Sequence, residues 1–151
     1  MKPPKIIGRL AYFFGYPLFR LLIRNTHRTY MVIVYNNRML VTKNWLGFQK
    51  KWRLPGGGVQ ADETAYMAVQ REIVEELGVS INESKLQQLT TEPLRSQYGY
   101  RYDLFLYTID QVPAMRIDNR EILVADFIGK NDLKQQDISE EVQQAIRLIG
   151  W

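Results

Sequence analysis

Three glutamates crowded onto one predicted helical face constrain this chain more than any other feature of its sequence. They are Glu72, Glu75 and Glu76, within the segment GGVQADETAYMAVQREIVEELGV of residues 57–79. Residues spaced by three and four positions project from the same face of a helix, so the three carboxylates lie side by side. Like charges at this spacing repel, and a hard divalent cation such as Mg²⁺ removes the repulsion because it takes carboxylate oxygens as ligands. The segment therefore predicts a metal-binding helix.

The residues around these glutamates follow a fixed spacing. Gly57 is followed after five residues by Glu63, and seven further residues lead to Arg71-Glu72, Ile73, Glu75-Glu76, Gly78 and Val79. This pattern resembles the box of the Nudix family at every fixed position. An acidic run alone usually means a solvated helix face, and the complete box makes that alternative the weaker one. With the preceding Trp52-x-Leu-Pro-Gly-Gly, the resemblance extends over roughly residues 28–130.

The resemblance implies a Mg²⁺-dependent pyrophosphohydrolase, with Mn²⁺ as a possible substitute, that cleaves a nucleoside diphosphate linked to another group. The implied metal ligands are the Gly56 carbonyl, Glu72, Glu75 and Glu76. Arg71 would orient the glutamates through an ion pair with Glu63. Glu72 is the candidate base that takes a proton from the attacking water. Glu121 is its rival, because family members often place a carboxylate before the corresponding strand, although a plain surface charge explains Glu121 as well.

Four residues outside the carboxylate face are candidate substrate ligands: Arg53, Gly57, Tyr100 and Tyr102. Arg53 enters the glycine loop on a short strand, where its charge can meet a phosphate. Gly57 allows a close approach to the backbone. Tyr100 and Tyr102 alternate along a strand and share one sheet face, where a base can stack, although ordinary strand packing is the simpler interpretation.

Other residues limit the alternatives. The chain has no cysteine, which removes thiolate metal sites and argues against cysteine-dependent isomerase chemistry on the same fold. A nucleotide-binding Nudix sensor without catalysis would be expected to lose box glutamates, and none is missing. Family members often have Glu at the position of Gln60 and Gly at that of Asp62, which leaves the number of metal ions open. His27, the only histidine, is predicted to be a linker residue.

The predicted fold class is α+β, a Nudix-type mixed β-sheet packed between helices with an additional N-terminal amphipathic helical arm. The tight pair Asn36-Asn37 predicts a hairpin turn with left-handed backbone. Gly78 predicts the end of the acidic helix. We expect strands at 29–35, 38–43, 52–54, 86–94, 100–109 and 121–128, and helices at 3–24 (broken near Pro17), 64–77 and 139–149. The arm would span residues 1–27 and the Nudix hydrolase domain residues 28–151.

The arm carries the positive charge of the chain. Residues 1–30 hold six basic residues and no acidic one: Lys2, Lys5, Arg9, Arg20, Arg24 and Arg28. The remainder is slightly acidic, so the basic pI predicts no binding of nucleic-acid duplexes. The arm is also apolar and interrupted by charges and Pro17, which favours neither a cleaved signal nor a spanning helix. We expect a cytoplasmic protein whose arm packs on its own domain, on a second copy in a homodimer, or peripherally on the inner membrane surface.

Overall fold

The computed structural model describes residues 24–45 and 50–151. Most of the predicted arm, residues 1–23, lies outside the described residues, together with its expected contacts to a second copy or a membrane. The described elements, in chain order, are β1 (His27–Tyr35), β2 (Arg38–Asn44), β3 (Gly56–Gly58), α2 (Ala65–Leu77), the 3₁₀ turn η1 (Glu83–Lys85), β4 (Leu86–Gln88), β5 (Leu94–Arg95), β6 (Arg101–Thr108), β7 (Ile122–Gly129), α3 (Lys130–Leu133) and α4 (Glu140–Leu148).

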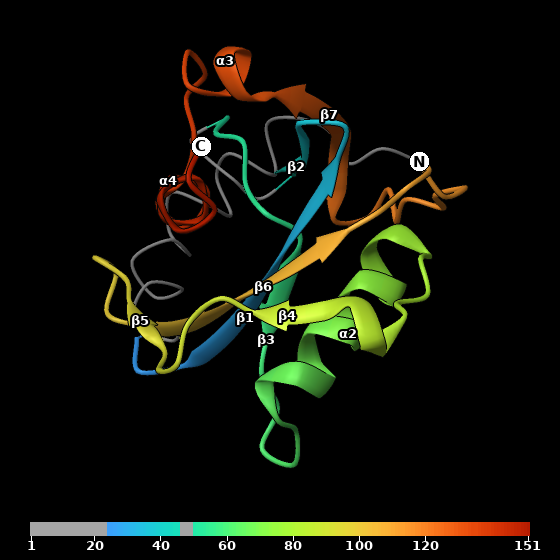
Figure 1. The fold of residues 1–151 in the computed structure, drawn as a ribbon. Coiled ribbons are helices and arrows are strands. Elements are labelled where there is room, and N and C mark those ends of the chain that lie inside the picture. Colours follow the sequence, from blue (N-terminus) through green and yellow to red (C-terminus); the bar gives the residue numbers. More distant parts are fainter. Residues whose placement is uncertain (1–23, 46–49) are drawn as a thin grey trace, which may run out of the picture.

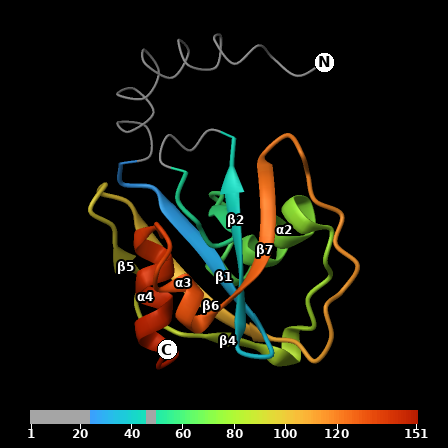
Figure 2. The same cartoon turned by 90° about the horizontal axis from the view of Figure 1, so that it is seen from above.

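The strands form one mixed sheet in the order β4-β6-β1-β2-β7, with β3 paired to β1 and β5 paired to β6. The central pair, β1 and β6, is parallel over eight residue pairs, and the other pairs are antiparallel. Helix α2 covers one face of the sheet, while α3 and α4 lie on the other (Figures 1 and 2). The predicted α+β class, a mixed sheet packed between helices, is confirmed. No helix within the described ranges has the length and apolar character needed to cross a membrane.

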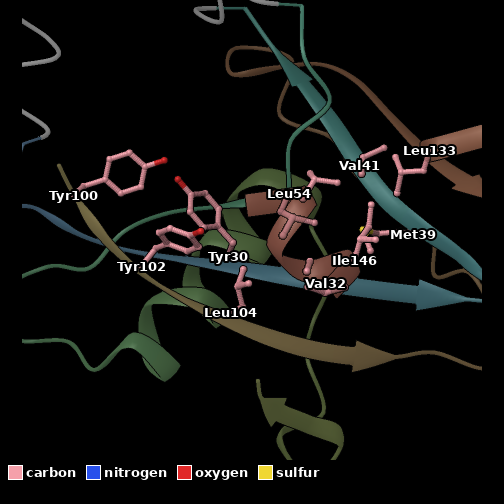
Figure 3. Packing of buried hydrophobic residues seen from close by; sticks show 12 residues of the cluster. Tyr30, Val32, Met39, Val41, Leu54, Tyr100, Tyr102, Leu104, Leu133 and Ile146 are labelled. Carbon is pink, nitrogen blue, oxygen red and sulfur yellow. The ribbon is translucent and has the colours of Figure 1, made fainter. Parts of the chain in front are cut away.

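Alternation along β1 divides the core into two layers. Tyr30 and Val32 point to the face covered by α4, where Val142 and Ala145 are buried against them. Figure 3 shows this layer, including three tyrosines grouped near the start of β1. Met31 and Ile33 point to the opposite face and pack against the apolar stripe of α2, which consists of Val69, Ile73 and Leu77. Because the apolar stripe of α2 packs on the sheet, helical periodicity places the carboxylates on a different face of the helix.

Several predicted elements are found and others differ. The hairpin turn has positive φ at Asn36 (44°) and Asn37 (56°), as predicted. Residues 52–54 form only isolated bridges, and the glycine run expected as a loop is instead strand β3. The expected strand at 86–94 is two short strands, β4 and β5, separated by a loop. Helix α3 was not predicted, because four residues are too few to give a periodic signal.

The hairpin turn offers a direct test of this backbone conformation. Replacing Asn37 by Ala should destabilise the protein by about 1 kcal/mol, because a Cβ without a local hydrogen-bonding group is disfavoured at positive φ. Replacing Asn37 by Gly should retain or raise the melting temperature, since Gly adopts this conformation without steric cost. Thermal unfolding of the two variants measures the difference, and equal melting temperatures would contradict the turn assignment.

Candidate functional site

Helix α2 is fixed at both ends by local capping. Thr64 accepts a hydrogen bond from the Met67 amide at the N-terminus, and Gly78 adopts φ 66° and donates to the Val74 carbonyl at the C-terminus. Between these caps the buried stripe packs on the sheet. The box glutamates therefore project along the side of the helix that faces β3.

Strand β3 can approach this helix closely because it consists of glycine. Gly56 pairs with Tyr30 and Gly57 with Thr29 of β1. A side chain at Gly56 would collide with the Thr29 carbonyl, and one at Gly57 would occupy the space of the Glu72 carboxyl group. Through this approach the Gly56 amide donates a hydrogen bond to Glu76 Oε2 at 2.9 Å.

Arg71 holds the acidic residues together. Its Nε and Nη2 donate to the two Glu63 oxygens at 2.6 and 3.0 Å, which is the ion pair expected from the sequence. Its Nη1 donates to Glu72 Oε1 and Glu75 Oε2, each at 3.0 Å, and Nη2 also reaches the Gly58 carbonyl at 3.0 Å. These five bonds use the full donor capacity of a guanidinium. Accordingly, the hydrogen bond from Arg71 lowers the pKa of Glu63.

The deepest carboxylate resists ionisation. Burial raises the pKa of Glu76 to about 8, with added repulsion from Glu72 and Glu121, while the Gly56 amide opposes the rise. Burial also raises the pKa of Glu72, against the hydrogen bond and charge of Arg71. Because Glu72 and Glu76 lie close together, ionisation of one carboxyl group makes ionisation of the other less favourable. A bound cation would relieve both.

The donor set fits a hard divalent ion such as Mg²⁺, because it consists of carboxylate oxygens beside a strand backbone. As the side chains stand, no three acidic, histidine or cysteine groups of the described residues lie close enough together to enclose a metal ion. The reason is visible in their partners: Glu72 and Glu75 are bonded to Arg71, and Glu76 to the Gly56 amide. Metal binding would therefore exchange these hydrogen bonds for coordination. The Gly56 carbonyl remains a predicted ligand, since the described contact uses its amide.

The other predicted site residues divide between two places. Glu121 is exposed just before β7, and its charge is among those that raise the pKa of Glu76, so it lies within electrostatic range of the acidic group. Arg53 bridges to Thr42 of β2, and its Nε donates to Glu141 Oε1 of α4 at 3.2 Å. It thus reaches the sheet face opposite α2.

Tyr100 and Tyr102 also lie on that opposite face, next to Tyr30. They are 3% and 1% exposed, and their rings are 6.0 Å apart between centroids. Their roles as substrate ligands stay predictions. The Tyr100 ring makes a cation–π contact with Arg28, whose guanidinium carbon lies 5.8 Å from the ring centroid.

Sequence reasoning missed three polar residues of the domain. Arg28 was assigned to no site, although its alternation with Tyr30 along β1 would have placed it on the same sheet face. Glu141 is 1% exposed and bound to Arg53, and no local motif marked it. His27 begins β1 rather than lying in a linker, and its Nε2 is 2.6 Å from Oδ2 of the buried Asp103.

Comparisons with known proteins agree with this geometry. A family model described as the NUDIX domain matches residues 25–148. A Caenorhabditis elegans protein named as a nudix hydrolase is 32% identical over 99 residues, which cover 66% of this chain and 26% of that protein. The chain thus spans about a quarter of the length of this curated relative.

Two solved structures show the same fold. A MutT NUDIX hydrolase from Burkholderia pseudomallei superposes with a TM-score of 0.68 and 22% identity, covering 83% of this chain and 98% of that one. A bifunctional NMN adenylyltransferase/ADP ribose pyrophosphatase from Francisella tularensis, complexed with AMP and a Mn ion, gives a TM-score of 0.72 and 20% identity. In that comparison the match covers 92% of this chain and 46% of the other.

The raised pKa of Glu76 predicts how stability depends on pH in metal-free protein. The unfolded chain releases this proton near pH 4.5, whereas the folded protein keeps it until about pH 8. The folded state binds more protons in this window, so stability should fall as pH rises from about 4.5 to about 8. Melting temperatures measured in chelator across this range should decline by several degrees.

The isosteric variant Glu76→Gln controls for other groups. It should show a flatter decline than wild type, because a neutral amide has no proton to lose. Added Mg²⁺ should raise the wild-type melting temperature most at the alkaline end, where the carboxylates are ionised. A wild-type profile that matches the variant would contradict the burial of a protonated Glu76.

Removing Arg71 should affect the whole acidic group. Arg71→Ala takes away five hydrogen bonds and leaves Glu63 and Glu72 without their counter-charge. Half-buried acceptors that lose a charged donor are costly, so we expect a loss of about 2 kcal/mol in the free energy of unfolding. Chemical denaturation measures it, with the exposed Arg95→Ala as the control. Wild-type stability in Arg71→Ala would show that the network contributes nothing.

Proposed function

The chain belongs to the Nudix family, and from this premise we propose that it is a divalent-cation-dependent pyrophosphohydrolase. The proposed substrate is a nucleoside diphosphate linked to another group, with Mg²⁺ as the ion and Mn²⁺ as a substitute. One observation carries the proposal: Glu72 and Glu76 contact the glycine strand, and Arg71 binds Glu72 together with Glu75. A chain selected for stability alone has no reason to bury a carboxyl group among others of its kind.

In the proposed mechanism, a bound cation would neutralise charge on the diphosphate oxygens and would lower the pKa of the water that attacks phosphorus. Glu75, Glu76 and Glu72 would hold this cation, with the Gly56 carbonyl as a further ligand. Arg71 is anchored by two hydrogen bonds to Glu63, so its part is to position Glu72 and Glu75 rather than to bind substrate. The bare backbone of Gly57 makes room for the Glu72 carboxyl group against β3.

The proton of the attacking water needs an acceptor. Glu72 is the proposed base, because its largely buried carboxyl group is held against Gly57 by Arg71, beside the place proposed for the cation. Glu121 is the alternative base. Its exposed position before β7 leaves it free to move toward the acidic group.

The proposal is tested by screening the purified protein against a panel of nucleotides and nucleoside-diphosphate conjugates with Mg²⁺ or Mn²⁺, measuring phosphate release. Glu75→Gln and Glu76→Gln should each lower turnover roughly 100-fold or more while the protein stays folded, because a lost metal ligand removes charge stabilisation in the transition state. The exposed Glu92→Gln serves as the matched control and should keep the wild-type rate. Chelator should abolish activity.

Three outcomes separate this proposal from its alternatives. Wild-type turnover in Glu75→Gln and Glu76→Gln would refute the metal assignment, and undiminished hydrolysis in excess chelator would refute the mechanism. Tight nucleotide binding with no turnover of any panel compound would favour a nucleotide sensor over an enzyme.

A further inference from the structure

We propose that Arg28 and Arg53 form a phosphate-binding subsite beside the acidic group, on the side of β3 that faces α4. The inference rests on the proposed function for the ligand class, a nucleoside diphosphate, and assigns the residues that bind its phosphate without a metal ion. Arg28 and Gly58 face each other in the β1–β3 pairing, so the subsite begins at the same glycine strand that the carboxylates contact.

Arg28 is held in place before any ligand arrives. Its Nε donates to the Tyr30 hydroxyl at 2.9 Å. Its guanidinium carbon lies 5.8 Å from the ring centroids of both Tyr30 and Tyr100, so two aromatic faces support the cation. Both tyrosines are 3% exposed and belong to the core. A side chain fixed in this way loses little conformational freedom when it binds an anion.

The guanidinium of Arg28 keeps donors unused. Its hydrogen-bond partner among the described residues is the Tyr30 hydroxyl, bonded through Nε, so its two terminal amino groups bond to none of these residues. Arg71 differs in this respect, since its donors are all taken by the protein. Arg28 is partly buried, and a partly buried cation with free donors is poorly compensated unless a ligand supplies acceptors.

Arg53 adds a second guanidinium on the same side of the sheet, the side covered by α4. Its one hydrogen bond among the described side chains runs from Nε to Glu141, which is fully buried and orients it. The pKa of Arg28 is raised, chiefly through Tyr30, while the charge of Arg53 opposes the rise. The two cations therefore lie within electrostatic range of each other, and of the two only Arg53 is bonded to the Glu141 carboxylate among the described residues. A bound dianion would remove the repulsion between them.

The location suits the second phosphate of a diphosphate. Arg28 pairs with Gly58 of β3, and the Gly58 carbonyl accepts a hydrogen bond from Arg71, whose guanidinium also binds Glu72. One phosphate can be held at the carboxylates through a cation, while its neighbour needs donors that carry their own charge. Guanidinium groups present such donors in a fork that matches phosphate oxygens. The Tyr102 hydroxyl, buried within the same aromatic group, also has no hydrogen-bond partner among the described residues.

The test measures binding of ADP in chelator, by calorimetry on the full chain, so that neither the metal site nor turnover contributes. Arg28→Gln should weaken ADP binding about tenfold or more, because a charge-assisted bidentate contact is lost. Arg28→Lys, which keeps the charge but not the fork, should weaken it several-fold. The double variant Arg53→Gln/Glu141→Gln removes the second cation together with its buried partner and should also weaken binding.

Arg101→Gln is the matched control. Arg101 is exposed and pairs with His27 in the β1–β6 pairing, so its side chain lies on the sheet face opposite that of Arg28. The Arg101→Gln substitution therefore changes the net charge as much as Arg28→Gln does, but on the other face. Arg101→Gln should bind ADP like wild type. Inorganic phosphate should show the same dependence on Arg28, whereas any binding of adenosine should not.

Two results would overturn the subsite: equal ADP affinities of Arg28→Gln and Arg101→Gln, or no detectable ADP binding by the wild type without metal. Arg28→Lys provides the same comparison if the Gln variant does not fold. Failure of the proposed function is recognised separately, because it would appear as absent hydrolysis with metal while ADP binding still depends on Arg28.

Discussion

The close contact between helix α2 and the glycine strand β3 is the constraint on which the rest of the site depends. Gly57 leaves the space that the Glu72 carboxyl group occupies, and the Gly56 amide meets Glu76. Arg71 then joins the helix to the loop before it through Glu63 and to β3 through the Gly58 carbonyl. Side chains at β3 would hold the helix further from the sheet. The carboxylates would then be exposed to solvent, and burial would no longer raise their pKa values.

This contact also explains the division of charge in the domain. Carboxylates gather on the α2 side of β3, where burial and mutual repulsion favour a cation. On the α4 side, the rings of Tyr30 and Tyr100 support Arg28, and the buried carboxylate of Glu141 binds Arg53. A diphosphate compound can interact with both groups, because its oxygens accept hydrogen bonds from arginine and also bind a divalent ion. The two charge groups meet at one strand, so a single substrate can use both.

Strong local signals explain why part of the fold could be predicted. The turn at Asn36-Asn37, the helix limits at Thr64 and Gly78, and the last helix each depend on neighbouring residues. Elements that depend on distant pairing were missed or misplaced. The glycine run was expected as a loop, because glycine has no intrinsic preference for a strand, and it is a strand only because β1 pairs with it. Likewise, the strand expected at 86–94 is two short strands, because its named strand pairings with β6 are limited to 86–88 and 94–95.

The sequence alone determined the acidic helix face and the family resemblance, because both follow from spacing within one segment, and the resemblance implied the Arg71–Glu63 ion pair. It could not determine that Glu76 is buried with a pKa near 8, since that value depends on how closely β3 and Glu121 approach the helix. Nor could it bring Arg28 to Arg53 and Glu141, which are far apart in the chain and meet only through strand pairing and the packing of α4. Spacing within a segment specifies which groups share a face, whereas burial and long-range pairing decide which of those groups meet and what charge they carry.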